Sequence, residues 1–196
     1  MDTSFITIVS GLPRSGTSMM MQVIEAGGVP VLCDHIRSQD DDNPKGYYEF
    51  ELVKKTKIDP SWVPGACGKV VKVIYSLLND LPSEYNYRVV FMERSLAEVL
   101  ASQKKMLERR GQKGGGVPDE KMAALFRSQL ATFEHWVRNQ KNFSMLRVGY
   151  ADMIADPVAA VDRVNKFLGG TLDREAMIRA VDPDLYRNRR SSAACS

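Results

Sequence analysis

The chain has 196 residues, of which 44% are hydrophobic and 26% charged, and its formal net charge is +3 at pH 7. This length and composition are typical of a globular protein with a sizeable core, and we expect residues 1–196 to form one domain. The mild positive charge favours a small polyanionic ligand over nucleic acid, and no apolar run approaches the roughly 20 residues of a membrane span.

Apolar, β-branched runs alternate with helix-like segments along the chain. Strands are predicted at residues 5–9, 70–74, 88–92 and 144–148, and helices at 19–26, 95–110, 120–139 and 157–168. The last helix has Asp156-Pro157 at its start and Gly169-Gly170 at its end. Residues 33–46 and 109–118 are rich in turn formers and predict loops. The alternation implies an α/β fold of three layers, with a mostly parallel central sheet flanked by helices.

Cysteine and histidine content disfavours disulfides and metal sites. The three cysteines, Cys33, Cys67 and Cys195, are odd in number and lack C-x-x-C spacing. Only His35 and His135 are present as histidines, and His135 lies in the apolar-periodic segment 126–137, as a helix-surface or packing residue. We expect no metal. A chain that runs from Asp2 straight into a strand shows no signal peptide, and a reducing cytoplasmic setting is expected.

The segment between the first strand and the first helix is typical of a phosphate cradle. It reads Ser10-Gly11-Leu12-Pro13-Arg14-Ser15-Gly16-Thr17-Ser18. In a strand–loop–helix unit of this kind, backbone N–H groups and the helix N-terminus converge on an anion. Gly11 and Gly16 have the P-loop spacing, but Thr17 stands where ATP and GTP enzymes carry lysine, and the cation is Arg14 inside the loop. The fold is therefore expected to be of the P-loop type, in either a kinase or NTPase or an enzyme that binds a phosphosulfate.

A second anion site is indicated at the end of the third predicted strand. Arg94 follows that strand, and Ser102 lies eight residues later, about two turns inside the next helix. An arginine fork and a serine hydroxyl can meet on one phosphate. Taken alone, the pair is weak evidence, because an arginine after a strand followed by a helical serine is common and favours surface charge and an ordinary helical serine.

Together the two motifs resemble the PAPS-dependent sulfotransferase family, in particular its short bacterial members. PAPS is 3′-phosphoadenylyl sulfate. Residues 13–18 are similar to that family's 5′-phosphosulfate loop, and Arg94 and Ser102 match its 3′-phosphate pair. Residues 43–49 and 146–157 are similar to two further family stretches, although Ala151 replaces the usual glutamate. The resemblance implies that PAPS is the donor and adenosine 3′,5′-bisphosphate the product. The implied donor-binding residues are Pro13, Arg14, Ser15, Gly16, Thr17, Ser18, Arg94 and Ser102.

The reaction expected from this resemblance is sulfonate transfer to a hydroxyl or amine by in-line displacement, without a metal. Arg14 would stabilise the charge that grows on the leaving phosphate. The sequence does not identify the catalytic base. Cytosolic members use a histidine after a central strand, but residues 68–75 contain none, and Lys72 and Tyr75 stand there instead. Counting as in tyrosylprotein sulfotransferase-like members leads to Asp34, beside His35, and Glu49 is a third candidate.

The C-terminal basic cluster, the two tryptophans and the function itself each allow more than one interpretation. Arg187 and Arg189 lie in a basic cluster that either closes over the donor's 3′-phosphate or adenine, or forms a solvated tail. Trp62 and Trp136 are expected in the core or a groove rather than as an adenine platform. A P-loop small-molecule kinase or NTPase and a non-catalytic nucleotide-binding relative remain the alternative functions. The acceptor is expected to be a small molecule or a peptide, and a homodimer is left open.

Overall fold

The computed structural model describes residues 4–34, 36, 46–109, 111 and 116–183. Its centre is a five-stranded sheet in the order β2-β3-β1-β4-β5, in which each pair of neighbours is parallel. The strands are β1 (Ile6–Gly11), β2 (Val31–Leu32), β3 (Val70–Lys72), β4 (Tyr87–Glu93) and β5 (Phe143–Gly149). Since β1 is the middle strand, the loop that follows it emerges at the centre of the sheet's carboxyl edge.

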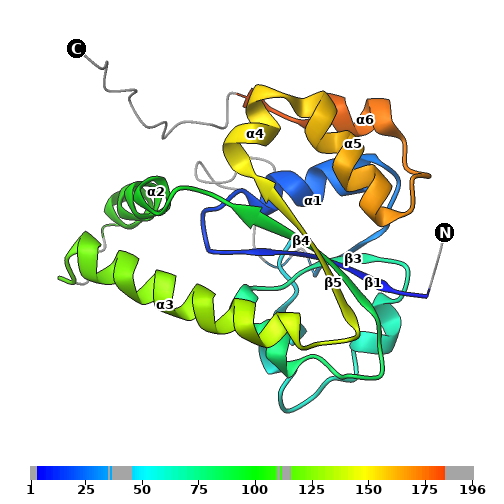
Figure 1. The fold of residues 1–196 in the computed structure, drawn as a ribbon, viewed down its shortest axis with the longest axis horizontal. Helices are drawn as coiled ribbons and strands as arrows, with labels where there is room; N and C mark the ends of the chain where they lie inside the picture. The colour runs from blue at the N-terminus through cyan, green and yellow to red at the C-terminus, as the bar shows by residue number, and fades with distance from the viewer. Residues whose placement is uncertain (1–3, 35, 37–45, 110, 112–115, 184–196) are drawn as a thin grey trace.

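Helices cover both faces of this sheet, as the sequence predicts (Figure 1). They are α1 (Thr17–Ala26), α2 (Leu96–Arg109), α3 (Asp119–Arg138), α4 (Tyr150–Ala155), α5 (Pro157–Leu168) and α6 (Arg174–Ala180). Three short 3₁₀ helices, η1 (Glu51–Lys55), η2 (Val63–Ala66) and η3 (Tyr75–Asp80), connect β2, β3 and β4. The predicted three-layer α/β fold with a parallel sheet is confirmed.

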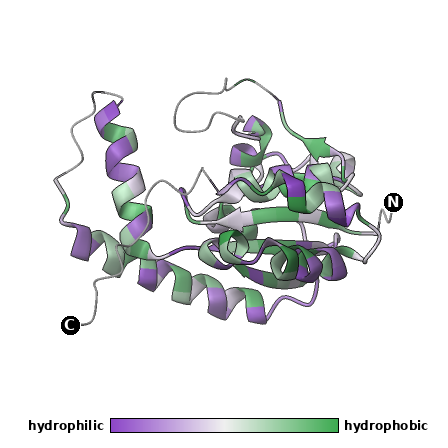
Figure 2. Ribbon diagram, turned by 90° about the horizontal axis from the view of Figure 1, so that it is seen from above, coloured by the Kyte–Doolittle hydropathy of each residue, from purple (hydrophilic) through white to green (hydrophobic). Residues whose placement is uncertain are grey.

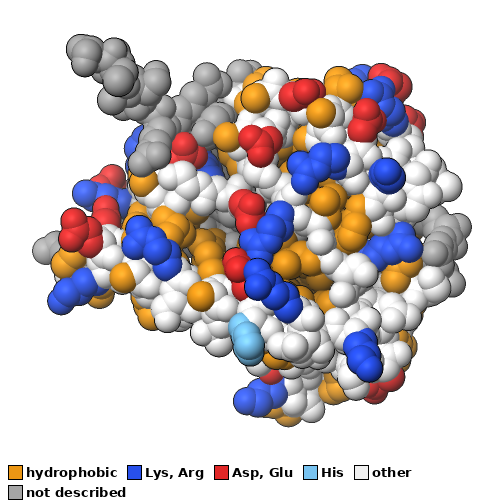
Figure 3. Space-filling model, in the orientation of Figure 1, with side chains coloured by type: hydrophobic (Ala, Val, Ile, Leu, Met, Phe, Trp, Pro, Cys, Tyr) orange, Lys and Arg blue, Asp and Glu red, His pale blue; other side chains and the backbone are white. Residues whose placement is uncertain are grey.

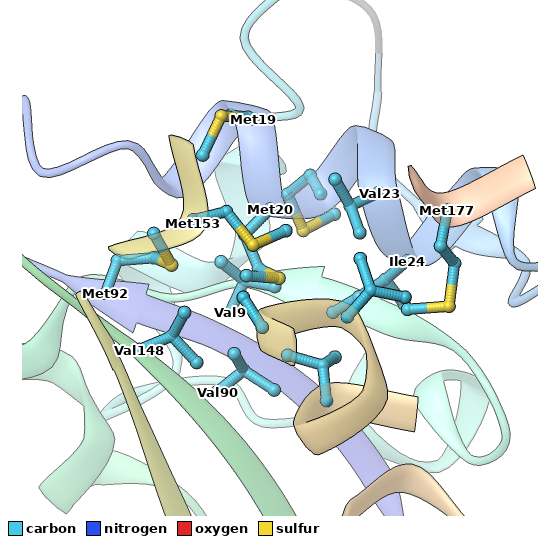
Figure 4. Packing of buried hydrophobic residues seen from close by; sticks show 14 of the residues in the cluster. Val9, Met19, Met20, Val23, Ile24, Val90, Met92, Val148, Met153 and Met177 are labelled. Carbon is cyan, nitrogen blue, oxygen red and sulfur yellow. The ribbon is translucent and has the colours of Figure 1, made fainter. Parts of the chain in front are cut away.

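The central strand alternates between two hydrophobic clusters, one on each face. Val9 packs with Val90 and Val148 against α1, α4, α5 and α6, whereas Ile8 packs with Val89 against α3 and the 3₁₀ helices. Figure 4 shows the first cluster, in which methionines from α1, β4, α4 and α6 fill the space between the sheet and the helices. Figure 2 shows the mostly hydrophobic strands between helices that carry both hydrophobic and hydrophilic sides. All six residues of β1 are buried, which fixes the start of the following loop.

The predicted elements match the observed ones where a strong local signal exists. At α5, the Asp156 side chain accepts a hydrogen bond from the Ala159 N–H at 3.0 Å, and Gly169 ends the helix at φ 119°. The strand predicted at 70–74 ends at Lys72, because Ile74 already precedes η3. The short elements β2, α4 and α6 were not predicted.

The pair α2 and α3 extends past the edge of the sheet in both Figure 1 and Figure 2. Within the described part of the chain, no helix is both long enough and apolar enough to cross a membrane. Of the predicted loops, residues 35, 37–45, 110 and 112–115 lie outside the described residues.

Candidate functional site

The loop between β1 and α1 has a backbone that requires glycine at two positions. Gly11 has φ 147° and Gly16 has φ 100°. A Cβ on Gly11 would lie 2.6 Å from the Ser15 Oγ and 2.7 Å from the Met92 carbonyl oxygen. A Cβ on Gly16 would lie 2.3 Å from the Tyr150 ring. The two glycines therefore let the loop pack tightly against β4 and α4.

Arg14 lies inside this loop in the left-handed region, at φ 70°. Its Nε donates a hydrogen bond to the Ser102 Oγ, at 3.0 Å. Non-glycine residues in this region are uncommon, and they persist where the surrounding structure holds them. The contact joins the cation predicted for the 5′-phosphosulfate to the hydroxyl predicted for the 3′-phosphate. The two anion sites expected from the sequence are thus in direct contact.

Ser15, the next residue, is almost fully buried. Its backbone N–H donates to the Leu12 carbonyl at 3.1 Å, and its hydroxyl has no hydrogen-bond partner among the described residues. α1 begins directly after Gly16, and no side chain caps its first turn. The helix also has no acidic residue in that turn. Because the first turn of α1 carries neither a side-chain cap nor an acidic residue, its N–H groups suit an anionic ligand.

Arg94 is held from three sides at the end of β4. Its Nε donates to the Glu98 Oε2 at 3.0 Å, and its Nη1 donates to the Arg14 carbonyl oxygen at 3.2 Å. The guanidinium carbon also lies 4.6 Å from the centroid of the Tyr150 ring. The Arg94 and Glu98 side chains are only 7% and 9% exposed. A buried ion pair of this kind fixes the direction of the guanidinium.

A cleft of about 400 Å³ lies beside these residues, at the carboxyl ends of β4 and β5. Ser15, Arg94 and Tyr150 line it near the loop, and Phe91, Leu96, Leu130, Glu134 and Arg147 line it further out. Arg147 bridges Glu93 and Glu134. In Figure 3, apolar side chains gather in a hollow of the surface with acidic and basic side chains beside it. Ligands of parallel α/β sheets bind outside the carboxyl ends of the strands, where this cleft lies.

The candidate bases differ in what their side chains already do. Both Asp34 oxygens accept backbone N–H groups, from Ile36 at 3.1 Å and from Glu51 at 2.6 Å. The Asp34 carboxylate therefore holds the turn before η1. His35 lies outside the described residues. Tyr75 is buried against α3, where its hydroxyl donates to the Gln129 Oε1 at 2.5 Å, which indicates a packing role.

Glu49 lies beside the end of β3, and its backbone carbonyl accepts the Asp34 N–H at 3.1 Å. Its Oε1 is 3.9 Å from the Nζ of Lys72, which also donates to the Tyr47 carbonyl. Lys72 ends β3 and lies in register with Val9 of β1, two residues before Gly11. The Glu49–Lys72 pair is thus placed at the carboxyl edge of the sheet, next to the strand that leads into the phosphate loop.

The remaining predicted residues are outside the site or outside the described residues. Trp62 is buried, and its Nε1 donates to Thr56, while Trp136 packs against Phe133 and Phe143. Both are core aromatics, as the sequence predicts. His135 is exposed on α3. Arg187 and Arg189 lie outside the described residues. Among the residues that are described, no group of three or more His, Cys, Asp or Glu is arranged to hold a metal ion.

Two residues of the site, Glu98 and Tyr150, were missed from the sequence. Glu98 is four residues from both Arg94 and Ser102, a spacing that could have revealed it as a neighbour of each. Tyr150 directly follows β5, a position that favours the ligand edge of a parallel sheet.

Comparisons with known proteins give one family. A model of the sulfotransferase domain matches residues 84–195. The sulfotransferase domain of the Synechococcus PCC 7002 olefin synthase is structurally similar, with a TM-score of 0.55 and 14% identity, over 92% of this chain and 78% of that one. The sulfotransferase domain from the curacin biosynthetic pathway has a TM-score of 0.51 and 15% identity, and the match covers 92% of this chain and 79% of that one. At these identities the likeness shows the fold. A search of curated proteins finds no match.

Proposed function

This chain belongs to the sulfotransferase domain family, and from that premise we propose that it transfers a sulfonate group from PAPS to a hydroxyl or amine acceptor. One observation carries the choice of donor. The loop cation Arg14 contacts both members of the Arg94–Ser102 pair, through its Nε and its carbonyl oxygen. A donor with phosphates at both the 5′ and 3′ positions of one ribose needs two such anion sites in close proximity.

The donor's 5′-phosphosulfate fits the loop and its 3′-phosphate fits the pair. Backbone N–H groups at the start of α1 and the hydroxyls of Thr17 and Ser18 are the donors of hydrogen bonds at the first site. Arg94 and Ser102 supply a guanidinium and a hydroxyl at the second, and both side chains are largely buried. Charge-assisted hydrogen bonds in a desolvated site are the strong ones.

In the proposed transfer, the acceptor oxygen or nitrogen forms a bond to sulfur while the bond from sulfur to the bridging phosphate oxygen breaks. Negative charge grows on that leaving oxygen, and adenosine 3′,5′-bisphosphate is released. We assign the stabilisation of this charge to Arg14, since it is the loop's cation. An arginine supplies that stabilisation without a metal ion.

The acceptor must also lose its proton, and we assign this role to Glu49. Its carboxylate lies beside Lys72 at the edge of the sheet that holds the phosphate loop, and the side chain is 27% exposed. Asp34 is less suited, because both of its oxygens accept backbone N–H groups. A general base needs an oxygen within hydrogen-bond reach of the acceptor. The acceptor, a small molecule or a peptide, would approach from the side of β3.

The proposal is tested by titration calorimetry with three ligands: adenosine 3′,5′-bisphosphate, adenosine 5′-monophosphate, and ATP with magnesium. We expect the bisphosphate to bind most tightly, with no change when a chelator is added. Tighter, magnesium-dependent binding of ATP would overturn the proposal in favour of a kinase or NTPase. Transfer of label from ³⁵S-PAPS across phenols, sugars, lipids and peptides then identifies the acceptor. Bisphosphate binding without any transfer would indicate a non-catalytic relative.

A further inference from the structure

Glu98 introduces a negative charge into the middle of a site proposed to bind anions. It is 8% exposed and lies on α2 one turn before Ser102, which is 3% exposed. A buried carboxylate next to a phosphate site should weaken phosphate binding by repulsion, unless it does something that outweighs this cost. Its position therefore calls for a role.

The contacts of Glu98 lead through Arg94 to the phosphate loop. Glu98 accepts the Arg94 Nε–H at 3.0 Å, and the same guanidinium donates from Nη1 to the carbonyl oxygen of Arg14 at 3.2 Å. Arg14 is one of two described non-glycine residues with positive φ, at 70°. The hydrogen bond to its carbonyl oxygen ties this uncommon backbone conformation to Arg94.

We infer that Glu98 is a positioning residue, which acts through Arg94 to hold both phosphate subsites in their binding geometry. The inference rests on the proposed function. Glu98 fixes the guanidinium of Arg94 between the 3′-phosphate subsite and the backbone of the 5′-phosphate loop. One ion pair thereby couples the two subsites, and its loss disturbs both.

This role predicts that removing the Glu98 charge weakens nucleotide binding, whereas repulsion between carboxylate and phosphate alone would predict tighter binding. In Glu98→Ala the site gains a net positive charge, yet the affinity for adenosine 3′,5′-bisphosphate falls about tenfold, the effect of losing one charge-assisted hydrogen bond. The affinity for adenosine 5′-monophosphate falls about threefold, because the loop loses its support. In Glu98→Gln the amide oxygen still accepts the Arg94 Nε–H, so both affinities stay within about twofold of the wild type.

The experiment is calorimetric titration of both nucleotides into the wild type, Glu98→Ala, Glu98→Gln and the control Glu108→Ala. Glu108 is an exposed glutamate on the same helix, and its replacement is expected to leave both affinities unchanged. Thermal melts followed by circular dichroism check that each variant is folded. If Glu98→Ala does not fold, Glu98→Asp replaces it. The aspartate keeps the charge but shortens the reach, so a loss of affinity is expected there too.

A double-mutant cycle with Arg94→Ala tests the route. Since Glu98 acts through Arg94, Glu98→Ala should cause no further loss of affinity in the Arg94→Ala background, where removing the unpaired carboxylate relieves repulsion. Equal or tighter bisphosphate binding by Glu98→Ala, an unchanged affinity for the monophosphate, or additive losses in the double mutant would each overturn this inference alone. A wild-type chain that does not prefer the bisphosphate would overturn the proposed function and this inference with it.

Discussion

Gly16→Ala should both destabilise the protein and damage the phosphate loop. The new Cβ would lie 2.3 Å from one carbon of the Tyr150 ring and 2.7 Å from the next, in a backbone with φ 100°. An L-residue with left-handed backbone costs about 1–2 kcal/mol, and overpacking costs typically 1–3 kcal/mol. We therefore expect a loss of about 3 kcal/mol in the free energy of unfolding, or a Tm about 6–12 °C lower for a chain of this size.

Two other glycines separate these contributions. Gly170 has φ 78° with open space around it, and Gly65 has open space and no positive φ. Gly170→Ala should lose about 1 kcal/mol from backbone strain, and Gly65→Ala should be close to neutral. The assay is urea unfolding followed by circular dichroism. A Gly16→Ala variant no less stable than Gly170→Ala would refute the close contact with Tyr150, as would a Tyr150→Ala background that relieves none of the Gly16→Ala cost.

Three further predictions concern chemistry and pH. Arg14→Ala should lower the rate of label transfer at saturating donor on the order of a hundredfold or more, and a near-normal rate would mean that Arg14 does not face the leaving group. Glu49→Gln should lower kcat by about a hundredfold or more, whereas Asp34→Asn should mainly lower the Tm. The reverse pattern in these two variants would move the base to Asp34. Burial raises the pKa of Tyr48 and Tyr87 above the usual value, so the folded chain keeps protons that the unfolded chain loses above about pH 10. Stability in urea should therefore fall as the pH rises above about 10, and a flat profile up to about pH 11 would contradict the raised pKa of these two hydroxyls.

The sequence predicts those parts of the fold that have strong local signals. The helix after Asp156-Pro157 has a side-chain cap at one end and Gly169 at the other, and its bounds follow from these residues. The two residues of β2 and the six of α4 are too short for periodicity to reveal, and tertiary packing decides them. A strand of two residues forms here because Val31 and Leu32 pair with β3.

The sequence proposes candidate site residues, but it does not predict the hydrogen bonds that join them. The glycine spacing predicts the loop between β1 and α1, whereas the Arg94–Ser102 spacing suggests a second anion site only when it is taken together with that loop. That Arg14 bonds to Ser102 follows only from placing α2 over the loop, across 88 positions of sequence. Likewise, Asp34 looks like a candidate base in the sequence, and only the fold reveals that Ile36 and Glu51 use both of its oxygens.

The central position of β1 has a consequence for how the chain acquires its site. Ile6 lies opposite Tyr87 in β4 and Thr7 lies opposite Val70 in β3, so the earliest strand finds both of its partners only much later in the sequence. Such long-range parallel pairing slows folding, because the entropy cost of closing a large loop comes before the stabilising contacts between the strands form. During synthesis, the phosphate loop cannot settle against Met92 until β4 has left the ribosome. Until then, the six residues of β1, all buried in the folded chain, are exposed. An exposed segment of this kind can be bound by chaperones or can aggregate.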